Sequence, residues 1–211
     1  MSESLQLSLA FGFRPAYGGD HFFVAPCNDN AVSWVDRWPD WPSPYLIIHG
    51  PAGCGKTHLA EVFRQRADAQ VLSHAALAKN CPRNPEETAG GWIVEDADSY
   101  LDDGEPEPLF HLFNQVLEGR GNLLLSSRAA PSQWRVELAD LRSRINAAPA
   151  VAIGSPDDQL LSAVLVKHFA DRQLRVGAKV VEYALKRMER SFDAVRDLVE
   201  ELDRQSLTAR R

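Results

Sequence analysis

The sequence predicts an α/β protein, with a parallel sheet that carries helices on both faces and a small helical domain after it. A short apolar run, Tyr45–His49, leads through a glycine-rich stretch into residues 57–67, whose apolar side chains have helical spacing. Further short apolar runs alternate with helical segments, whereas only helical patterns follow from Ser155 onward. Alternating strands and helices indicate a layered α/β sheet, and the change of pattern indicates a second domain.

The first domain is expected to contain five short strands. Tyr45–His49 is uniformly apolar, which is typical of a parallel strand that is buried on both faces of its sheet. Helices are expected within residues 29–41, ended by Pro39, over residues 57–67, and at Pro108–Glu118. The remaining strands are predicted at Val71–His74, Trp92–Glu95, Asn122–Ser127 and Ala150–Ile153.

Three amphipathic helices are predicted between Ser155 and the end of the chain. The first is expected to begin with a capping box formed by Ser155 and Asp158, with Pro156 at the first helical position. The sequence therefore divides into a flexible segment over residues 1–18, an α/β domain over residues 19–154 and a helical domain over residues 155–211.

Composition and charge narrow the class of protein. The 211 residues are 45% apolar and 25% charged, and no apolar run approaches the ~20 residues that span a bilayer. No Lys or Arg precedes Arg14, so the basic flank of a secretory signal peptide is missing and a cytoplasmic protein is expected. Cys27, Cys54 and Cys81 lack paired or zinc-ligand spacing, which predicts reduced thiols. The formal net charge of −6 opposes unassisted binding to nucleic acid.

The stretch "GPAGCGKT", Gly50–Thr57, has the spacing of a phosphate-binding P-loop and lies between a predicted strand and a predicted helix. Its glycines allow backbone N–H groups to surround phosphates at a helix N-terminus, where the helix dipole favours negative charge. Lys56 would reach the β- and γ-phosphates, and the Thr57 hydroxyl would hold Mg²⁺. The alternative is a glycine turn whose lysine is solvated. The expected nucleotide contacts are Gly50, Pro51, Ala52, Gly53, Cys54, Gly55, Lys56, Thr57 and His58.

Acidic residues follow a second predicted strand, in "GWIVEDAD". An acid at this position would complete a Mg²⁺ site beside the P-loop threonine. The motif offers Glu95, Asp96 and Asp98, and Glu95 or Asp96 is the expected metal partner alongside Thr57. The alternative is that these acids only cap the strand. Together the two motifs favour an adenine nucleotide, ADP or ATP, with Mg²⁺ as the ligand. The sequence contains no Asn-Lys-x-Asp guanine signature, but the motifs alone do not separate ATP from GTP.

Together with these motifs, three further segments resemble the bacterial AAA+ proteins of the DnaA family. They are "EPLFHLFNQVLEGRGNLLLSS", "DLRSR" and "RSFDAVRDLVEELDRQSLTARR", and they follow the family's order over nearly the whole chain. The resemblance implies an AAA+ P-loop NTPase sheet with a C-terminal helical lid. Within the family, the chain is most similar to short homologues that inactivate the replication initiator.

The resemblance assigns a role to the arginine that ends the "DLRSR" box, which is Arg144 here. In the family this residue is an arginine finger, which points from one subunit to a nucleotide held by another and stabilises charge on the transferring phosphoryl group. The alternative is a surface arginine that pairs with Asp140, one helical turn earlier. Arg142 is the weaker candidate.

Two further contacts with the nucleotide are implied by the resemblance. Arg196, in "DAVRDLVEEL", matches the lid arginine that reaches back to the bound phosphates, although an ion pair with Glu200 on the same helix face is the alternative. The segment "HFFVA" resembles the one that packs on adenine, which makes Phe23 and Val24 expected contacts.

Two departures from the family's pattern bear on function. Ser126, Ser127 and Arg128 stand where DnaA has an acidic residue at the end of the fourth strand, so weak intrinsic ATP hydrolysis is expected. The sequence ends at Arg211 without a helix-turn-helix segment, so direct recognition of a replication origin is not expected.

Near the start of the chain, "QLSLAF" resembles the short peptides that bacterial replication proteins insert into the sliding clamp. The Gln6 amide can donate and accept hydrogen bonds at a pocket rim, Leu9 and Phe11 can fill apolar cavities, and Leu7 adds contact. The alternative is an edge strand that turns Leu7, Leu9 and Phe11 onto the protein's own core.

These inferences lead to a regulator of the initiation of chromosome replication. It would bind adenine nucleotide and the sliding clamp, the beta subunit of DNA polymerase III, and would promote hydrolysis of DnaA-bound ATP through Arg144. DNA would be reached only through the clamp, no membrane partner is expected, and a homodimer is a further option. The alternative is an ATP-hydrolysing helicase loader or remodelling ATPase, which would turn over ATP on its own.

Overall fold

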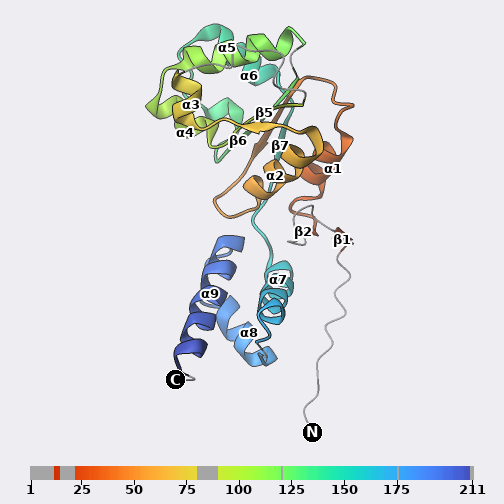
Figure 1. The fold of residues 1–211 in the computed structure, drawn as a ribbon, viewed down its shortest axis with the longest axis vertical. Helices are drawn as coiled ribbons and strands as arrows, with labels where there is room; N and C mark the ends of the chain where they lie inside the picture. Colours follow the sequence, from red (N-terminus) through yellow and green to blue (C-terminus); the bar gives the residue numbers. More distant parts are fainter. Residues whose placement is uncertain (1–11, 15–21, 80–89, 120, 175, 210–211) are drawn as a thin grey trace.

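The computed structural model describes residues 12–14, 22–79, 90–119, 121–174 and 176–209. In this part of the chain an α/β body lies above a bundle of three helices (Figure 1). The strands are β1 (Gly12–Arg14), β2 (Phe22–Val24), β3 (Tyr45–His49), β4 (Gln70–Val71), β5 (Gly91–Val94), β6 (Asn122–Ser127) and β7 (Ala150–Ala152). The helices are α1 (Asp29–Arg37), α2 (Lys56–Ala67), α3 (His74–Lys79), α4 (Ala97–Asp103), α5 (Pro106–Leu117), α6 (Ala139–Ala147), α7 (Asp158–Asp171), α8 (Ala178–Leu185) and α9 (Phe192–Ala209).

The central sheet has the strand order β4-β5-β6-β3-β7, and its strands are parallel. Because β3 lies between β6 and β7, the loop that leaves its carboxyl end has a strand on each side. Ile47 of β3 and Val94 of β5 both pair with Leu125 of β6, so these three strands end at nearly the same level. The register therefore brings the residues after β3 and after β5 to one edge. β1 and β2 form a separate antiparallel pair.

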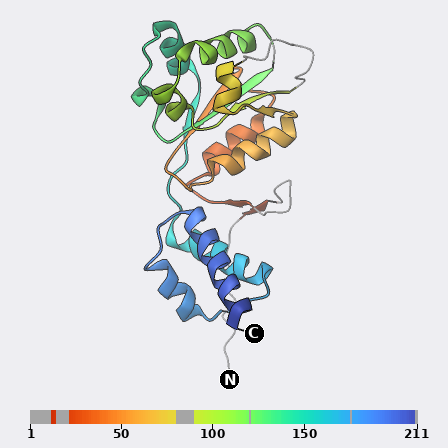
Figure 2. The same ribbon diagram turned by 60° about the vertical axis from the view of Figure 1, so that its left-hand side comes forward.

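Helices cover both faces of the sheet, which confirms the predicted fold class (Figures 1 and 2). In β3, Leu46 and Ile48 pack in one core cluster with α1 and α2. Tyr45 and Ile47 pack in another cluster with α3, α4, α5 and α6. Burying each large apolar side chain contributes roughly 1.5–3 kcal/mol, so a strand covered on both faces requires an uninterrupted apolar run.

The helical bundle, defined as α7, α8 and α9, has a core of its own. Val164 of α7, Val181 of α8 and Val195 of α9 are among its buried residues. Phe23 of β2 and Ala25 after it belong to the same core. The segment around β2 therefore packs against the bundle, and Figure 2 shows it between the two bodies.

Two of the five predicted strands have the predicted limits, Tyr45–His49 and Asn122–Ser127. The strands at Trp92–Glu95 and Ala150–Ile153 are also present, with ends that differ by one residue. The prediction of a strand over Val71–His74 was wrong, because β4 ends at Val71 and α3 begins at His74. Ser73 starts that helix: its Oγ accepts a hydrogen bond from the Ala76 N–H at 3.2 Å.

The helix predicted at Pro108–Glu118 begins earlier, at Pro106, because proline suits the first turn of a helix. Helix α4 was not predicted from the sequence. None of the helices in the described part of the chain is both long and apolar enough to cross a membrane.

The predicted capping box at the start of the bundle was wrong. Helix α7 begins at Asp158, and its N-cap is Asp157, whose Oδ1 accepts a hydrogen bond from the Leu160 N–H at 2.7 Å. Asp158 instead receives hydrogen bonds from Arg190 at 2.8 and 3.2 Å. The N-cap carboxylate supplies one of the acceptors that the first turn of a helix lacks.

Replacing the N-cap should therefore destabilise the protein. We predict that Asp157→Ala lowers the free energy of unfolding by about 1 kcal/mol, because it removes the acceptor for the Leu160 N–H. Ser155→Ala is the matched control and should change it by less than about 0.5 kcal/mol. Urea unfolding followed by tryptophan fluorescence measures both. Equal losses in the two variants would contradict the assignment of the cap.

Candidate nucleotide-binding site

The P-loop stretch Gly50–Thr57 joins the carboxyl end of β3 to the start of α2. Gly53 has φ +63° and Gly55 has φ +102°, which are left-handed conformations that favour glycine. A Cβ on Gly50 would lie 2.3 Å from the carbonyl oxygen of Ile153, so only glycine lets the loop pass so close to the chain after β7. The glycines of the motif are therefore required by the backbone geometry.

Lys56 lies inside the loop and is 8% exposed. Its Nζ donates hydrogen bonds to the carbonyl oxygens of Gly50, at 2.9 Å, and Pro51, at 2.8 Å. These bonds use two of the three donors of the ammonium group. A phosphate oxygen is a stronger acceptor for this group than a neutral carbonyl. The loop thus holds a buried positive charge at the N-terminus of α2, where anions are favoured.

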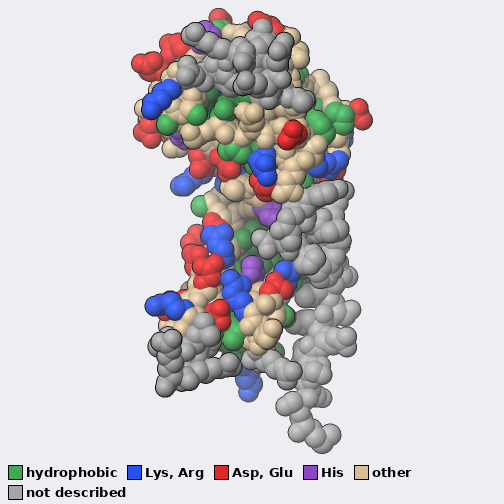
Figure 3. Space-filling model, viewed as in Figure 1, with side chains coloured by type: hydrophobic (Ala, Val, Ile, Leu, Met, Phe, Trp, Pro, Cys, Tyr) green, Lys and Arg blue, Asp and Glu red, His purple; other side chains and the backbone are tan. Residues whose placement is uncertain are grey.

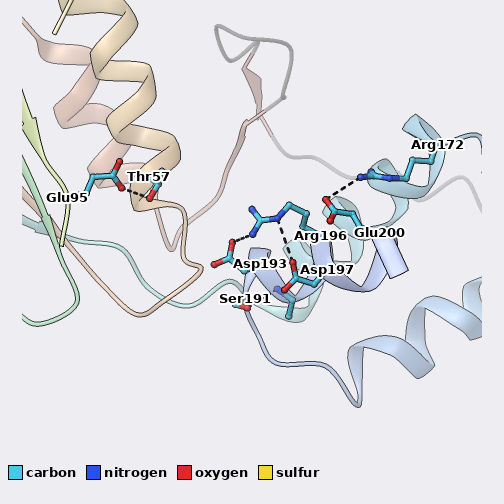
Figure 4. Close-up of polar contacts among 9 residues, drawn as sticks. Thr57, Glu95, Arg172, Ser191, Asp193, Arg196, Asp197 and Glu200 are labelled. Carbon is cyan, nitrogen blue, oxygen red and sulfur yellow. Dashed lines mark hydrogen bonds and ion pairs between the residues drawn. The ribbon is translucent and has the colours of Figure 1, made fainter. Parts of the chain in front are cut away.

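The structure brings Thr57 and Glu95 together from different strand ends. The Thr57 hydroxyl donates a hydrogen bond to Glu95 Oε2 at 2.6 Å (Figure 4). His74 Nε2 lies 2.8 Å from the carbonyl oxygen of Glu95, which fixes the backbone there. A hydroxyl and a carboxylate at the edge of a phosphate loop are oxygen ligands of the kind that Mg²⁺ prefers.

The other two acids of "GWIVEDAD" have different surroundings. Asp96 adopts a left-handed conformation with φ 49°, and its N–H donates to Ser126 Oγ at 3.2 Å. Asp98 Oδ2 accepts hydrogen bonds from the backbone N–H groups of Arg128 and Ala129, at 2.9 and 3.0 Å. Asp98 therefore ties the start of α4 to the end of β6, whereas Glu95 is the acid that contacts Thr57.

A cavity of about 420 Å³ lies between the P-loop and the helical bundle (Figure 3). Its walls come from β2, the loop and α2 on one side, and from α7 and α9 on the other. The apolar part of the wall includes Phe23, Val164 and Phe192. The remaining lining residues are Gly53, Gly55, Lys56, Thr57, His58, Glu61, Lys167, His168, Asp193 and Arg196.

Several residues predicted from the sequence line this cavity, namely Phe23, Gly53, Gly55, Lys56, Thr57, His58 and Arg196. Cys54 is buried, at 1% exposure, and Val24 packs against the cluster of α1 and α2. Gly50, Pro51 and Ala52 complete the loop without lining the cavity. The sequence did not indicate Glu61, Val164, Lys167, His168, Phe192 or Asp193. Glu61 lies one helical turn after Thr57, and this spacing could have indicated that it faces the same cavity. The positions of the other residues depend on how the helical bundle packs against the loop.

The start of α9 contacts the apex of the P-loop directly. The Phe192 N–H donates a hydrogen bond to the Gly53 carbonyl oxygen at 2.8 Å. A Cβ on Gly53 would lie 2.7 Å from the Cβ of Ser191, so glycine also makes room for this contact. The bundle therefore closes one side of the cavity through backbone atoms as well as side chains.

Arg196 lies in this first part of α9 and is held by two acids of its own helix (Figure 4). Its Nη2 lies 2.8 Å from Asp193 Oδ1, and its Nε lies 3.8 Å from Asp197 Oδ1. The alternative that Arg196 pairs with Glu200 was wrong, because Glu200 pairs with Arg172 at 3.8 Å. Arg196 thus reaches the cavity with its charge already partly compensated.

Arg144 is half-buried on α6, away from this cavity. Its guanidinium carbon lies 5.1 Å from the centre of the Phe110 ring, a cation–π contact between α6 and α5. The expected alternative, an ion pair with Asp140, is not found among the described residues. Arg142 is exposed. Gln6, Leu7, Leu9 and Phe11 lie outside the described residues.

Two groups at the site have displaced pKa values. Hydrogen bonds from Arg64 and Gln65 lower the pKa of Glu61 to about 2, so this carboxylate stays charged at neutral pH. Burial raises the pKa of the Cys54 thiol. Because the thiolate is the reactive form, Cys54 is an inert part of the loop.

The fold is that of AAA+ P-loop domains, as comparison with solved structures shows. Domain III of the Thermotoga maritima replication initiation protein DnaA superposes with a TM-score of 0.75 and 18% identity, over 90% of this chain and 88% of that one. The crystal structure of a DNA replication initiation factor superposes with a TM-score of 0.72 and 17% identity, over 86% of this chain and 62% of that one. The Thermotoga maritima RuvB Holliday junction branch migration motor superposes with a TM-score of 0.64 and 15% identity, over 87% of this chain and 62% of that one.

Sequence comparison adds less. No family model matches the chain. An uncharacterized protein of Haemophilus influenzae is 28% identical over 181 residues, which cover 82% of this chain and 78% of that protein. At these identities the solved structures define the fold alone, so the activity has to be inferred from the residues of the site.

The contact between Thr57 and Glu95 makes a testable prediction about metal. We predict that Mg²⁺ increases the affinity of the wild type for ATP. In Glu95→Gln this increase should be smaller by roughly tenfold or more, because the negative charge of a metal-binding carboxylate is removed. Asp96→Asn, the matched control, should keep most of the gain. Calorimetric titrations with Mg²⁺ and with EDTA measure the difference. A larger loss in Asp96→Asn than in Glu95→Gln would assign the metal to Asp96 instead.

Proposed function

We propose that this protein binds an adenine nucleotide, ADP or ATP, with Mg²⁺ in the cavity between the P-loop and the helical bundle. One observation carries the proposal: the phosphate loop, Thr57 and an apolar wall line the same cavity of about 420 Å³, and the Thr57 hydroxyl is bonded to the Glu95 carboxylate. That volume is within the range of ligand pockets. DnaA structures with AMPPCP bound are among the solved structures that share this fold, which supports an adenine base.

The residues present fit such a ligand. Lys56 and the N-terminus of α2 would hold the phosphates, and Thr57 with Glu95 would hold the metal ion. Phe23, Val164 and Phe192 offer the apolar surface that a base requires. Bound Mg²⁺ would neutralise phosphate charge, and Arg196 would add a positive charge from the bundle.

We further propose that the protein regulates replication initiation in the manner of Hda, a short DnaA homologue that inactivates the initiator. In this proposal Arg144 acts in trans on ATP held by DnaA, and Gln6, Leu7, Leu9 and Phe11 bind the sliding clamp. Support comes from the "DLRSR" box, the DnaA-like fold and the position of Arg144 on α6, half-exposed beside Phe110. The nucleotide of the protein itself would then be structural.

A second candidate is an ATP-hydrolysing loader or remodeller. The complete P-loop and the Thr57–Glu95 pair favour it, because both are needed for hydrolysis. The end of β6 disfavours it. The residues there are Ser126 and Ser127, which have hydroxyls in place of a carboxylate that could orient water. Both are buried, and the Ser127 hydroxyl already donates to the Ala129 carbonyl oxygen. Weak intrinsic hydrolysis is expected.

One reconstitution tests the regulator. We predict that the protein speeds phosphate release from DnaA–ATP when the DNA-loaded clamp is present, and that omitting any component removes the effect. In Arg144→Ala the stimulation of phosphate release should be at least about tenfold weaker, because an arginine finger supplied by a second subunit stabilises the transition state strongly. Arg142→Ala, on the same helix and more exposed, should retain it. Rapid ATP turnover by the protein alone would instead favour the second candidate.

The same assay has a clamp arm. Changing Gln6, Leu9 and Phe11 together to alanine should remove both clamp binding in a pull-down and the stimulation. The melting temperature should stay nearly unchanged, because the proposal gives these side chains a partner outside this chain. A large fall in melting temperature with clamp binding preserved would place the hexapeptide in the protein's own core.

A further inference from the structure

A pair of opposite charges on α9 lies at the P-loop side of the cavity. Asp193 and Arg196 both line the cavity, and their side chains are bonded at 2.8 Å. Both side chains are about half exposed, at 53%. Other charged lining residues are paired differently: Lys167 binds Asp171 and Glu61 binds Arg64, and neither partner lines the cavity. The Asp193–Arg196 pair is therefore placed where a ligand can compete with it.

Asp193 is held against the P-loop by its neighbours. Its Oδ2 lies 3.0 Å from the position that a Cβ on Gly53 would take. The Phe192 N–H is bonded to the Gly53 carbonyl, and the Ser191 hydroxyl accepts a hydrogen bond from the Ala194 N–H at 3.1 Å. Because the N–H groups of Phe192 and Ala194, on either side of Asp193, are both bonded, the carboxylate remains beside the apex of the loop (Figure 4).

The charge of Asp193 reaches the loop itself. Burial is the main cause of the raised pKa of the Cys54 thiol, and the negative charge of Asp193 adds to it. An anion that raises a neighbouring thiol pKa also repels other anions placed there. Asp193 thus opposes the electrostatic effect of Lys56 and of the N-terminus of α2.

We propose that Asp193 is a positioning residue that holds Arg196 and competes with nucleotide phosphates for its guanidinium group. Asp193 Oδ1 accepts one hydrogen bond from Arg196 Nη2, so a phosphate that approaches this edge of the guanidinium replaces that bond. Asp193 therefore weakens binding of the charged part of the ligand and leaves binding of the base unaffected. This inference rests on the proposed nucleotide binding.

Calorimetric titration of ADP and of adenosine separates these effects. Asp193→Asn should bind ADP roughly three- to tenfold more tightly than the wild type, because the competing charge is gone. Adenosine carries no phosphate, and its affinity should not change. Asp197→Asn is the matched control: its carboxylate lies 3.8 Å from Arg196 and does not line the cavity, so ADP affinity should change less than about twofold.

Two more measurements distinguish charge competition from a change of shape. The gain for ADP should shrink between about 50 mM and about 500 mM NaCl, because salt screens half-exposed charges. It should also disappear in the Asp193→Asn, Arg196→Ala double variant, because Asp193 acts through Arg196. Asp193→Ser repeats the test with a residue that also suits a helix N-terminus, in case Asp193→Asn folds poorly.

Either of two results would overturn the inference. If the wild type binds ADP and Asp193→Asn and Asp193→Ser bind it no more tightly, the competition is absent while the nucleotide site stands. If the folded wild type binds neither ADP nor adenosine, the proposed nucleotide binding fails as well.

Discussion

The contact between the P-loop apex and the start of α9 is the constraint on which the site depends. Gly53 must be glycine because it has φ +63° and because Ser191 occupies the space of a side chain. Its carbonyl oxygen accepts the hydrogen bond from Phe192. This contact turns two separately packed bodies, each with its own core, into the two walls of one cavity. Without it, the cavity would lose the part of its apolar wall that the bundle provides.

Charge at this junction is balanced rather than uniformly positive. Lys56 is buried inside the loop and bonded to its carbonyl groups, while Arg196 is bonded to Asp193. A phosphate that takes these donors therefore replaces bonds that the protein already makes. The net gain is smaller than the count of positive residues suggests. The order of the strands also shapes the site. Because β3 and β5 both pair with β6 and end at nearly the same level, Thr57 after β3 lies close enough to Glu95 after β5 to bond it.

Much of this could be predicted from local sequence. The buried run Tyr45–His49, the loop and helix that follow it, and the three C-terminal helices were predicted correctly, because each has a strong periodic or spacing signal. Local competition caused the errors: Ser73 ends β4 early, and Asp157 displaces Ser155 as the N-cap. The lining residues from α7 and α9, such as Val164 and Asp193, could not be predicted, because they depend on how the bundle packs against β2 and the loop.

The central claim is that the P-loop and the helical bundle together form a nucleotide site, and calorimetric titration of ADP into Lys56→Ala tests it most directly. The account predicts that the wild type binds ADP and that Lys56→Ala loses at least about tenfold in affinity, because a buried charge at the phosphates is removed. Melting temperatures without ligand establish that the variant is folded, and ADP should raise that of the wild type only. ADP affinity equal to that of the wild type in a folded Lys56→Ala variant would contradict the claim.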